Sequence, residues 1–578
     1  MYPPPCVIPD PCRVSSLAPI DGRRQRIVGA AMACALAAVL CLWSSSGCAV
    51  DALPVSAPSV EPFPDASSFA VIVIPDLQRT LDHLQRIVAA VTPPGAPVAS
   101  PAAGLGLMLQ DPGLKNLQAA PVVAVLMPGA PAPCLVCMLP CTAPQSYVDA
   151  ATSQGMAGAV VGTLAVIGQD QAAVTNALAL AQQYRVLTAH RTSADLRVLV
   201  APQRLAASYG ALVRMLLETM VPVPESKKVI LRTEVSVVLA IAQDIAEVQS
   251  DYSLADGAIQ LDQVLVAAPG SALALALVQV PDAVAANAKA GSRLVQRPAL
   301  IGVSARYHAA ALSAYVVGLL QGVASAPAMQ RVLTPQVLDA LAACSRSQSG
   351  DLALQLVGVP AGIRYSEALG CSDPAALFAA QGLLLDAING QQGLARDLGS
   401  STTRQSRVRM IGDVPVTRLT TVIDPAMIPG SNATSLAAMT APTEMAASNG
   451  FVYLSQEPGN LDALVQGRGT GMTLQAQSAF AAGMDGYADA DLPGLIRACS
   501  ALVAPGAGST LPPMGTPSAP LISCWRSAAG RCQLQMRLPL ASLSSICVSV
   551  QGIAAQFQAA PGAATGHAVT HSQPTRAF

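Results

Sequence analysis

The chain has 578 residues, a formal net charge of −1, 52% hydrophobic residues and 3% aromatic residues. The near-neutral charge gives no electrostatic footprint for nucleic acid, so we expect no nucleic-acid partner. The hydrophobic excess is mostly Ala, Val and Leu in short segments, and no run after residue 43 has the roughly 18 apolar residues of a membrane span.

The N-terminal residues 1–47 have the order of a secretory signal. Three arginines end the leader, an uncharged apolar run follows at 27–43, and "SSGC" closes it at 45–48. This closing segment resembles a bacterial lipobox, in which Gly precedes the Cys that receives the lipid, although Ser45 stands where Leu is usual. We therefore predict a lipoprotein signal peptide at 1–47 and lipidation of Cys48. The alternatives are an uncleaved anchor helix and a secreted protein without lipid.

Residues 48–66 are rich in Pro, Ala and Ser, and such a segment cannot build a core. We predict an extended tether between the lipid and the folded part. The expected location is the bacterial cell envelope, lipid-anchored on the periplasmic side or at the outer membrane. The membrane is then one partner, and other envelope proteins are candidates.

Internal similarity follows the tether. A strand-like run and a helix-like run recur at 67–91, 193–218 and 297–322, and more weakly at 448–467. A strand pair followed by a helix occurs at 121–155 and again at 350–382. We predict an α+β fold of two related halves, each built from antiparallel strands with packed helices. The predicted boundaries are 67–292 and 293–560, the second half carries a longer insertion, and 561–578 form a disordered tail.

Three hairpins are marked by turn residues between strand-like runs. The predicted turns lie at Asp256-Gly257, at Gly412-Asp413 and near 528–530.

The pattern resembles the DUF3352-type family of bacterial envelope proteins. The resemblance covers most of residues 67–470 and depends on the strand pair with its helix and on "GTLAVIGQDQAAV" and "GFVYLSQEPGNL", where a strand runs into a helix. The family has no established activity, so the resemblance implies no functional residues.

Cysteine is the residue type that suggests local chemistry. Cys524 and Cys532 flank a short turn, and we predict a cross-strand disulfide between them, since disulfides are permitted outside the cytoplasm. Further candidate pairs are Cys344 with Cys371 and Cys499 with Cys547. The run Cys134-x2-Cys137-x3-Cys141 could bind metal or exchange disulfides, but it lacks a fourth ligand and is typical of a buried strand.

We identify no catalytic residues, no cofactor and no metal ligands. The five histidines are scattered, and the sequence contains no HExxH, P-loop, G-x-S-x-G or S-x-x-K motif. The local basic cluster comprises Arg404, Arg407, Arg409 and Arg418, which is a candidate patch for an anionic partner or a solvated sheet surface.

The sequence therefore favours a lipid-anchored, non-enzymatic envelope protein with a structural, binding or assembly role. One alternative is a carrier that encloses a lipid or another apolar ligand between sheet and helices. Another is a hydrolase whose active site is assembled from distant residues.

Overall fold

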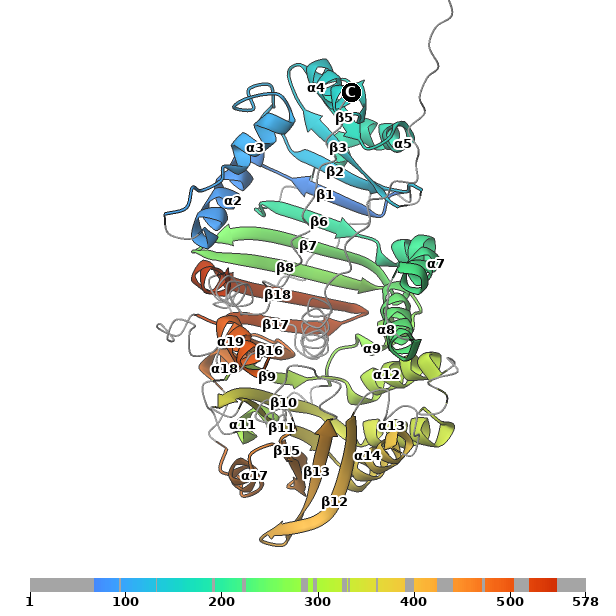
Figure 1. Cartoon of the computed structure of the whole chain (residues 1–578), viewed down its shortest axis with the longest axis vertical. Coiled ribbons are helices and arrows are strands. Elements are labelled where there is room, and N and C mark those ends of the chain that lie inside the picture. Colours follow the sequence, from blue (N-terminus) through green and yellow to red (C-terminus); the bar gives the residue numbers. More distant parts are fainter. Residues whose placement is uncertain are drawn as a thin grey trace, which may run out of the picture.

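A computed structural model describes residues 67–547 of the chain. A short set of segments inside this range is not described: 93–94, 131, 190–192, 221–224, 282–288, 295–298, 325–329, 331–332, 360–361, 390–399, 424–439, 470–472 and 504–518. The described part is built around one antiparallel sheet of 18 strands that extends along the length of the molecule (Figure 1).

The described residues of the first half contribute eight strands to this sheet. Its elements are β1 (Ala70–Ile74), α2 (Leu77–Val91), α3 (Pro101–Met108), β2 (Val122–Met127), β3 (Cys134–Pro140), α4 (Pro144–Ser153), β4 (Ala157–Val161), β5 (Leu164–Gly168), α5 (Gln171–Gln182), α6 (Tyr184–Leu187), β6 (Leu196–Val200), α7 (Pro202–Met220), α8 (Glu225–Asp244), β7 (Ile245–Ala255), β8 (Ala258–Ala267), α9 (Ala272–Ala276) and α11 (Ala290–Arg293).

Ten strands come from the part of the second half that the structure describes. Its elements are β9 (Ile301–Arg306), α12 (Ala309–Ala324), α13 (Pro335–Ser347), β10 (Gln348–Val359), β11 (Gly362–Cys371), α14 (Pro374–Asn389), β12 (Ser400–Ile411), β13 (Val414–Ile423), β14 (Thr443–Ser448), β15 (Phe451–Ser455), α17 (Pro458–Val465), α18 (Leu474–Ala481), β16 (Gly486–Ala490), α19 (Leu492–Val503), β17 (Leu521–Ala528) and β18 (Arg531–Pro539).

The strand order confirms the two related halves. In the first half the strands lie side by side in the order β4-β5-β3-β2-β1-β6-β7-β8. The second half repeats this order as β14-β15-β11-β10-β9-β16-β17-β18. The predicted insertion is the hairpin β12–β13, which adds two strands beyond β14. The fold class is α+β.

The halves join through β8 and β18, which pair antiparallel from Ala258 opposite Pro539 to Val266 opposite Arg531. Asp262 stands opposite Gln535, and each is the fifth residue of its strand. A pseudo-two-fold axis therefore passes between these two residues, perpendicular to the sheet. The two halves share one sheet and are not separate domains.

Helices cover both faces of the sheet in its outer parts. On one face, here named the α5 face, buried side chains of β1, β2, β3 and β5 pack against Val174 and Leu180 of α5. On the opposite face, named the α4 face, Tyr147 and Val148 of α4 pack against Leu139 and Ile167. Because both faces are covered, these strands are continuous apolar runs without polar alternation.

The second half repeats this packing. Leu461 and Leu464 of α17 pack against Phe451 and Tyr453 on the α5 face. Leu377 and Phe378 of α14 lie near Met445 and Val452 on the α4 face. Helix α11 begins within the predicted first half, yet its Ala290 belongs to the α5-face core of the second half, so the structural boundary lies before this helix.

All three predicted hairpins are confirmed as β7–β8, β12–β13 and β17–β18. Asp256 and Gly257 have φ values of 49° and 67° between β7 and β8. Positive φ at both central residues is the requirement of a tight two-residue turn whose twist matches the strands, which is why Asp-Gly marks it.

Candidate functional site

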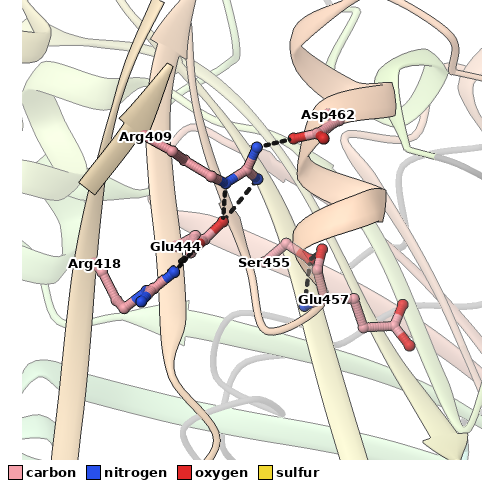
Figure 2. Close-up of polar contacts among 6 residues, drawn as sticks. All are labelled: Arg409, Arg418, Glu444, Ser455, Glu457 and Asp462. Atoms are coloured by element: carbon pink, nitrogen blue, oxygen red, sulfur yellow. Dashed lines mark hydrogen bonds and ion pairs between the residues drawn. The ribbon is translucent and has the colours of Figure 1, made fainter. Parts of the chain in front are cut away.

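Glu444 of β14 is a carboxylate with 1% of its surface exposed, and two arginines from neighbouring strands neutralise it. Arg409 of β12 donates from Nε and Nη2 to Oε2 at 2.9 and 2.7 Å. Arg418 of β13 donates from Nε and Nη2 to Oε1 at 3.2 and 2.7 Å. Arg409 Nη1 also reaches Asp462 Oδ1 of α17 at 2.5 Å (Figure 2). We call these four residues the Glu444 cluster.

Strand register explains why the cluster forms. Arg418 is the direct partner of Glu444 across β13 and β14. Arg409 lies opposite Val416, two residues before Arg418, so both arginines share the α5 face. Asp462 meets them there because α17 covers the same face.

The electrostatics of the cluster are balanced. Burial alone would raise the pKa of Glu444, but the hydrogen bonds and positive charges of Arg409 and Arg418 outweigh burial and hold this pKa below its usual range. An ionised carboxylate of this kind accepts hydrogen bonds and does not exchange protons near neutral pH. The cluster therefore ties the inserted hairpin to β14 and α17.

The structure corrects the predicted basic patch, because it does not bring the four arginines together. Arg409 and Arg418 have carboxylate partners within the chain. Arg404 donates to the carbonyl oxygen of Phe378 at 2.8 Å, and its guanidinium lies 5.8 Å from the centroid of that ring. It therefore packs on α14, which covers the α4 face.

Arg407 is exposed, and its φ of 55° lies where the register shifts between Gln405 and Arg409. Among the described strands, β12 is the last at this end of the sheet. A bulge and an exposed cation on an edge strand discourage pairing with a strand of another molecule. The structure therefore supports the solvated-surface interpretation for Arg407.

A row of buried polar groups adjoins the Glu444 cluster. Ser455, opposite Glu444 in β15, has its Oγ 3.2 Å from Ser366 Oγ, and Asn460 Nδ2 donates to Ser366 Oγ at 2.5 Å. Ser455 Oγ also accepts from the backbone N–H of Glu457 at 3.0 Å (Figure 2). These bonds fix the turn from β15 into α17. Local spacing in the sequence gives no sign of them, because Ser366 lies 89 residues from Ser455 and 94 residues from Asn460.

A second missed contact joins His83 of α2 to Asp195, which precedes β6. His83 Nδ1 lies 2.6 Å from Asp195 Oδ2, and Arg79 Nε lies 2.9 Å from Asp195 Oδ1. The N–H of Leu254 also donates to Asp195 Oδ2 at 2.8 Å. A carboxylate that orients a histidine can serve acid–base chemistry, and here it also fastens α2 to the sheet.

The three clustered cysteines do not converge. Cys134 and Cys137 point to opposite faces of β3, since they are three residues apart. The Cys134 thiol donates to Asp170 Oδ2 at 3.0 Å, and the Cys141 thiol donates to the carbonyl oxygen of Leu139 at 3.3 Å. Within the described residues, no group of three or more His, Cys, Asp or Glu side chains is placed to hold a metal ion.

The predicted disulfide between Cys524 and Cys532 does not fit the register of β17 and β18. Cys524 stands opposite Gln535, whereas Cys532 stands opposite Ser527. The two side chains therefore leave opposite faces of the hairpin, and a three-residue offset separates their Cα atoms by about 10 Å along the strands. A disulfide requires a Cα separation below about 7 Å. The prediction is wrong for this register.

Glu367 of β11 is a partly buried carboxyl on the apolar α4 face, between Leu354 of β10 and Leu454 of β15. Burial raises its pKa to about 7. Its charge also contributes to the raised pKa values of Tyr307 and Tyr365. The pattern of a lone carboxylate between apolar strand residues was the available sequence signal.

Cys48, the predicted site of lipidation, lies outside the described residues. None of the described helices is long and apolar enough to cross a membrane. Comparison of the chain with protein-family models, curated proteins and solved structures found no match. The resemblance to the DUF3352-type family therefore stays a prediction.

Proposed function

We propose that the protein is a lipid-anchored extracytoplasmic component of the bacterial cell envelope, with a non-catalytic structural, binding or assembly role. The observation that carries the proposal is the N-terminal sequence: arginines, an uncharged run at 27–43, "SSGC" at 45–48 and a Pro-rich tether. Two acyl chains on one cysteine suffice for stable membrane anchoring.

The architecture is compatible with such a role. The described part is built around a single sheet, and the polar clusters found on it join one element to another. The Glu444 cluster fastens a hairpin, and Asp195 fastens α2. These contacts fix the hairpin and the helix to the sheet, and a rigid structure of this kind suits a structural role.

The intact mass of the protein purified from its native membrane tests the proposal. We expect a chain that begins at Cys48 and carries acyl groups, and we expect the Cys48→Ser variant to lose both the acyl groups and membrane retention. A mass that retains residues 1–47 would contradict the proposal and would favour the uncleaved anchor.

The central strands support a second candidate function, transport of an apolar ligand. Their α4 face carries Leu254, Ile259, Trp525 and Leu534, all of them partly exposed. Apolar side chains that are not fully buried offer contact area to a lipid.

Mass spectrometry of co-purified lipid tests this second function. We expect lipid to accompany the wild-type chain and to fall several-fold in Ile259→Asp, because a charge on that face opposes an apolar ligand. Gln260→Asp is the matched control, since Gln260 lies next in the strand but on the opposite face. Equal lipid content in all three proteins, or none in the wild type, would contradict a carrier.

A further inference from the structure

Two cysteines meet where the last turn of α13 runs into β10. Cys344 lies in that turn, and Cys371 is the last residue of β11. The Ser347 hydroxyl donates to the carbonyl oxygen of Cys344 at 2.6 Å and lies 3.4 Å from Cys371 Sγ. One hydroxyl group therefore touches both cysteine residues.

The backbone explains this proximity. Gln348 opens β10 and is the register partner of Cys371, so their Cα atoms are roughly 5 Å apart. Cys344 precedes Gln348 by about one helical turn, a rise of about 6 Å. These two steps limit the Cα separation of Cys344 and Cys371 to at most about 11 Å, and the two thiols are near enough for Cys371 to influence the pKa of Cys344. By contrast, the register holds Cys524 and Cys532 apart.

The surroundings distinguish the two thiols. Cys371 is 1% exposed, whereas Cys344 is partly exposed. Burial raises the pKa of Cys344, and the adjacent Cys371 raises it further. Thiols of this kind are slow to exchange, which is typical of structural rather than catalytic cysteines.

We propose that Cys344 and Cys371 form a disulfide in the native protein. The proposal rests on the proposed extracytoplasmic location, because disulfides persist in oxidising compartments. The bond would tie the last turn of α13 to the end of β11, directly before α14.

The oxidant is a protein disulfide of the thiol–disulfide oxidoreductase class. The partly exposed Cys344, as thiolate, attacks one oxidant sulfur, which forms a mixed disulfide and releases the other oxidant sulfur as a thiolate. The Cys371 thiolate then attacks Cys344 Sγ, forms the internal S–S bond and releases the second oxidant thiolate. The two cysteines lose two electrons and two protons, and the oxidant becomes a dithiol.

The duplicated fold supplies a matched control. Cys141 follows β3 as Cys371 ends β11, and both precede a Pro that opens a helix, α4 or α14. Cys141 is 0% exposed, but α3, which takes the place of α13 in the first half, contains no cysteine. Cys141 should therefore remain a thiol under the same conditions.

The test uses the full chain purified from its native membrane. The protein is quenched in acid, then denatured at neutral pH in the presence of N-ethylmaleimide, so that buried free thiols are alkylated before reduction. Trypsin cleavage at Arg346 and Arg364 separates the two cysteines. We expect a linked peptide pair containing Cys344 and Cys371, whereas Cys141, Cys524 and Cys532 carry the alkyl group. Alkylation of both Cys344 and Cys371 before reduction would overturn the proposal.

Two further readouts keep the test decisive. In Cys344→Ser, which changes the less buried residue, Cys371 should become alkylated after denaturation, and the unfolding temperature should fall by several degrees. The mass of the N-terminal peptide separates this proposal from the proposed function. Acylated Cys48 with two alkylated thiols defeats the disulfide alone, whereas a linked pair in a chain that retains residues 1–47 defeats the lipoprotein alone.

Discussion

Replacement of Glu444 by glutamine is expected to lower the free energy of local unfolding around β13 and β14 by about 3 kcal/mol at pH 7. The carboxylate is 1% exposed and receives four hydrogen bonds from two guanidinium groups. Without it, Arg409 and Arg418 would face each other across an uncharged amide. Their side chains are 27% and 38% exposed, so water would partly solvate the two unpaired guanidinium groups. We therefore expect a destabilisation at the lower end of the range for breaking a buried ion pair.

Hydrogen exchange of the β13 and β14 amides measures this effect locally. Asp462→Asn is the matched control: it removes the 41% exposed partner of Arg409 and should cost less than about 1 kcal/mol. The pKa of Glu444 is lowered in the fold, so its contribution is present above its unfolded pKa and is lost as pH falls through the folded pKa. Two results would contradict this prediction. One is an equal loss of stability in Glu444→Gln and Asp462→Asn, and the other is a stability difference between wild type and Glu444→Gln that does not become smaller in acid.

Replacement of Glu367 by glutamine should have the opposite sign. Burial raises the pKa of Glu367 from 4.5 to about 7, so the folded protein keeps a proton that the unfolded chain loses above pH 4.5. The carboxyl therefore costs stability progressively as pH rises from 4.5 to 7, and the full cost is present above that range. We expect Glu367→Gln to raise the free energy of unfolding by about 2–3 kcal/mol at pH 8 and to leave it unchanged at pH 4.

Urea unfolding at pH 4, 6 and 8 measures the difference in free energy of unfolding between the wild type and Glu367→Gln. Asp413→Asn, in the exposed turn of the inserted hairpin, is the matched control and should change stability by less than about 0.5 kcal/mol at each pH. A Glu367→Gln variant that is no more stable than the wild type at pH 8 would show that the carboxyl has access to water or to a partner.

The turns and the repeated strand pairs made much of the fold predictable. Asp256-Gly257 marks a hairpin because few other residue pairs accept positive φ at both positions. The repeat at 486–503, where β16 and α19 match β6 and α7, was missed. Its strand, "GYADA", has five residues like "LRVLV" in the first half, but it lacks the aliphatic run that identifies that strand.

The side-chain clusters were less predictable, because their members come from distant parts of the chain. Glu444 meets Arg418 and Arg409 across 26 and 35 residues, and His83 meets Asp195 across 112. The spacing of the four arginines in the sequence predicted one basic patch. It did not indicate that Glu444 lies between Arg409 and Arg418. The disulfide prediction failed for a related reason: two cysteines around a turn face each other only in the right register.

The pairing of β8 with β18 has the geometry of a subunit interface in a symmetric homodimer. In such a dimer the residue on the axis faces its own copy, and two aspartates there would place like charges directly opposite each other. In this chain Gln535 Nε2 instead donates to Asp262 Oδ1 at 2.9 Å. That bond requires different residues at equivalent positions, which identical subunits cannot have. Because the two halves belong to one polypeptide, the residues at equivalent positions of β8 and β18 can differ, and each strand can carry the side chain that its neighbour requires.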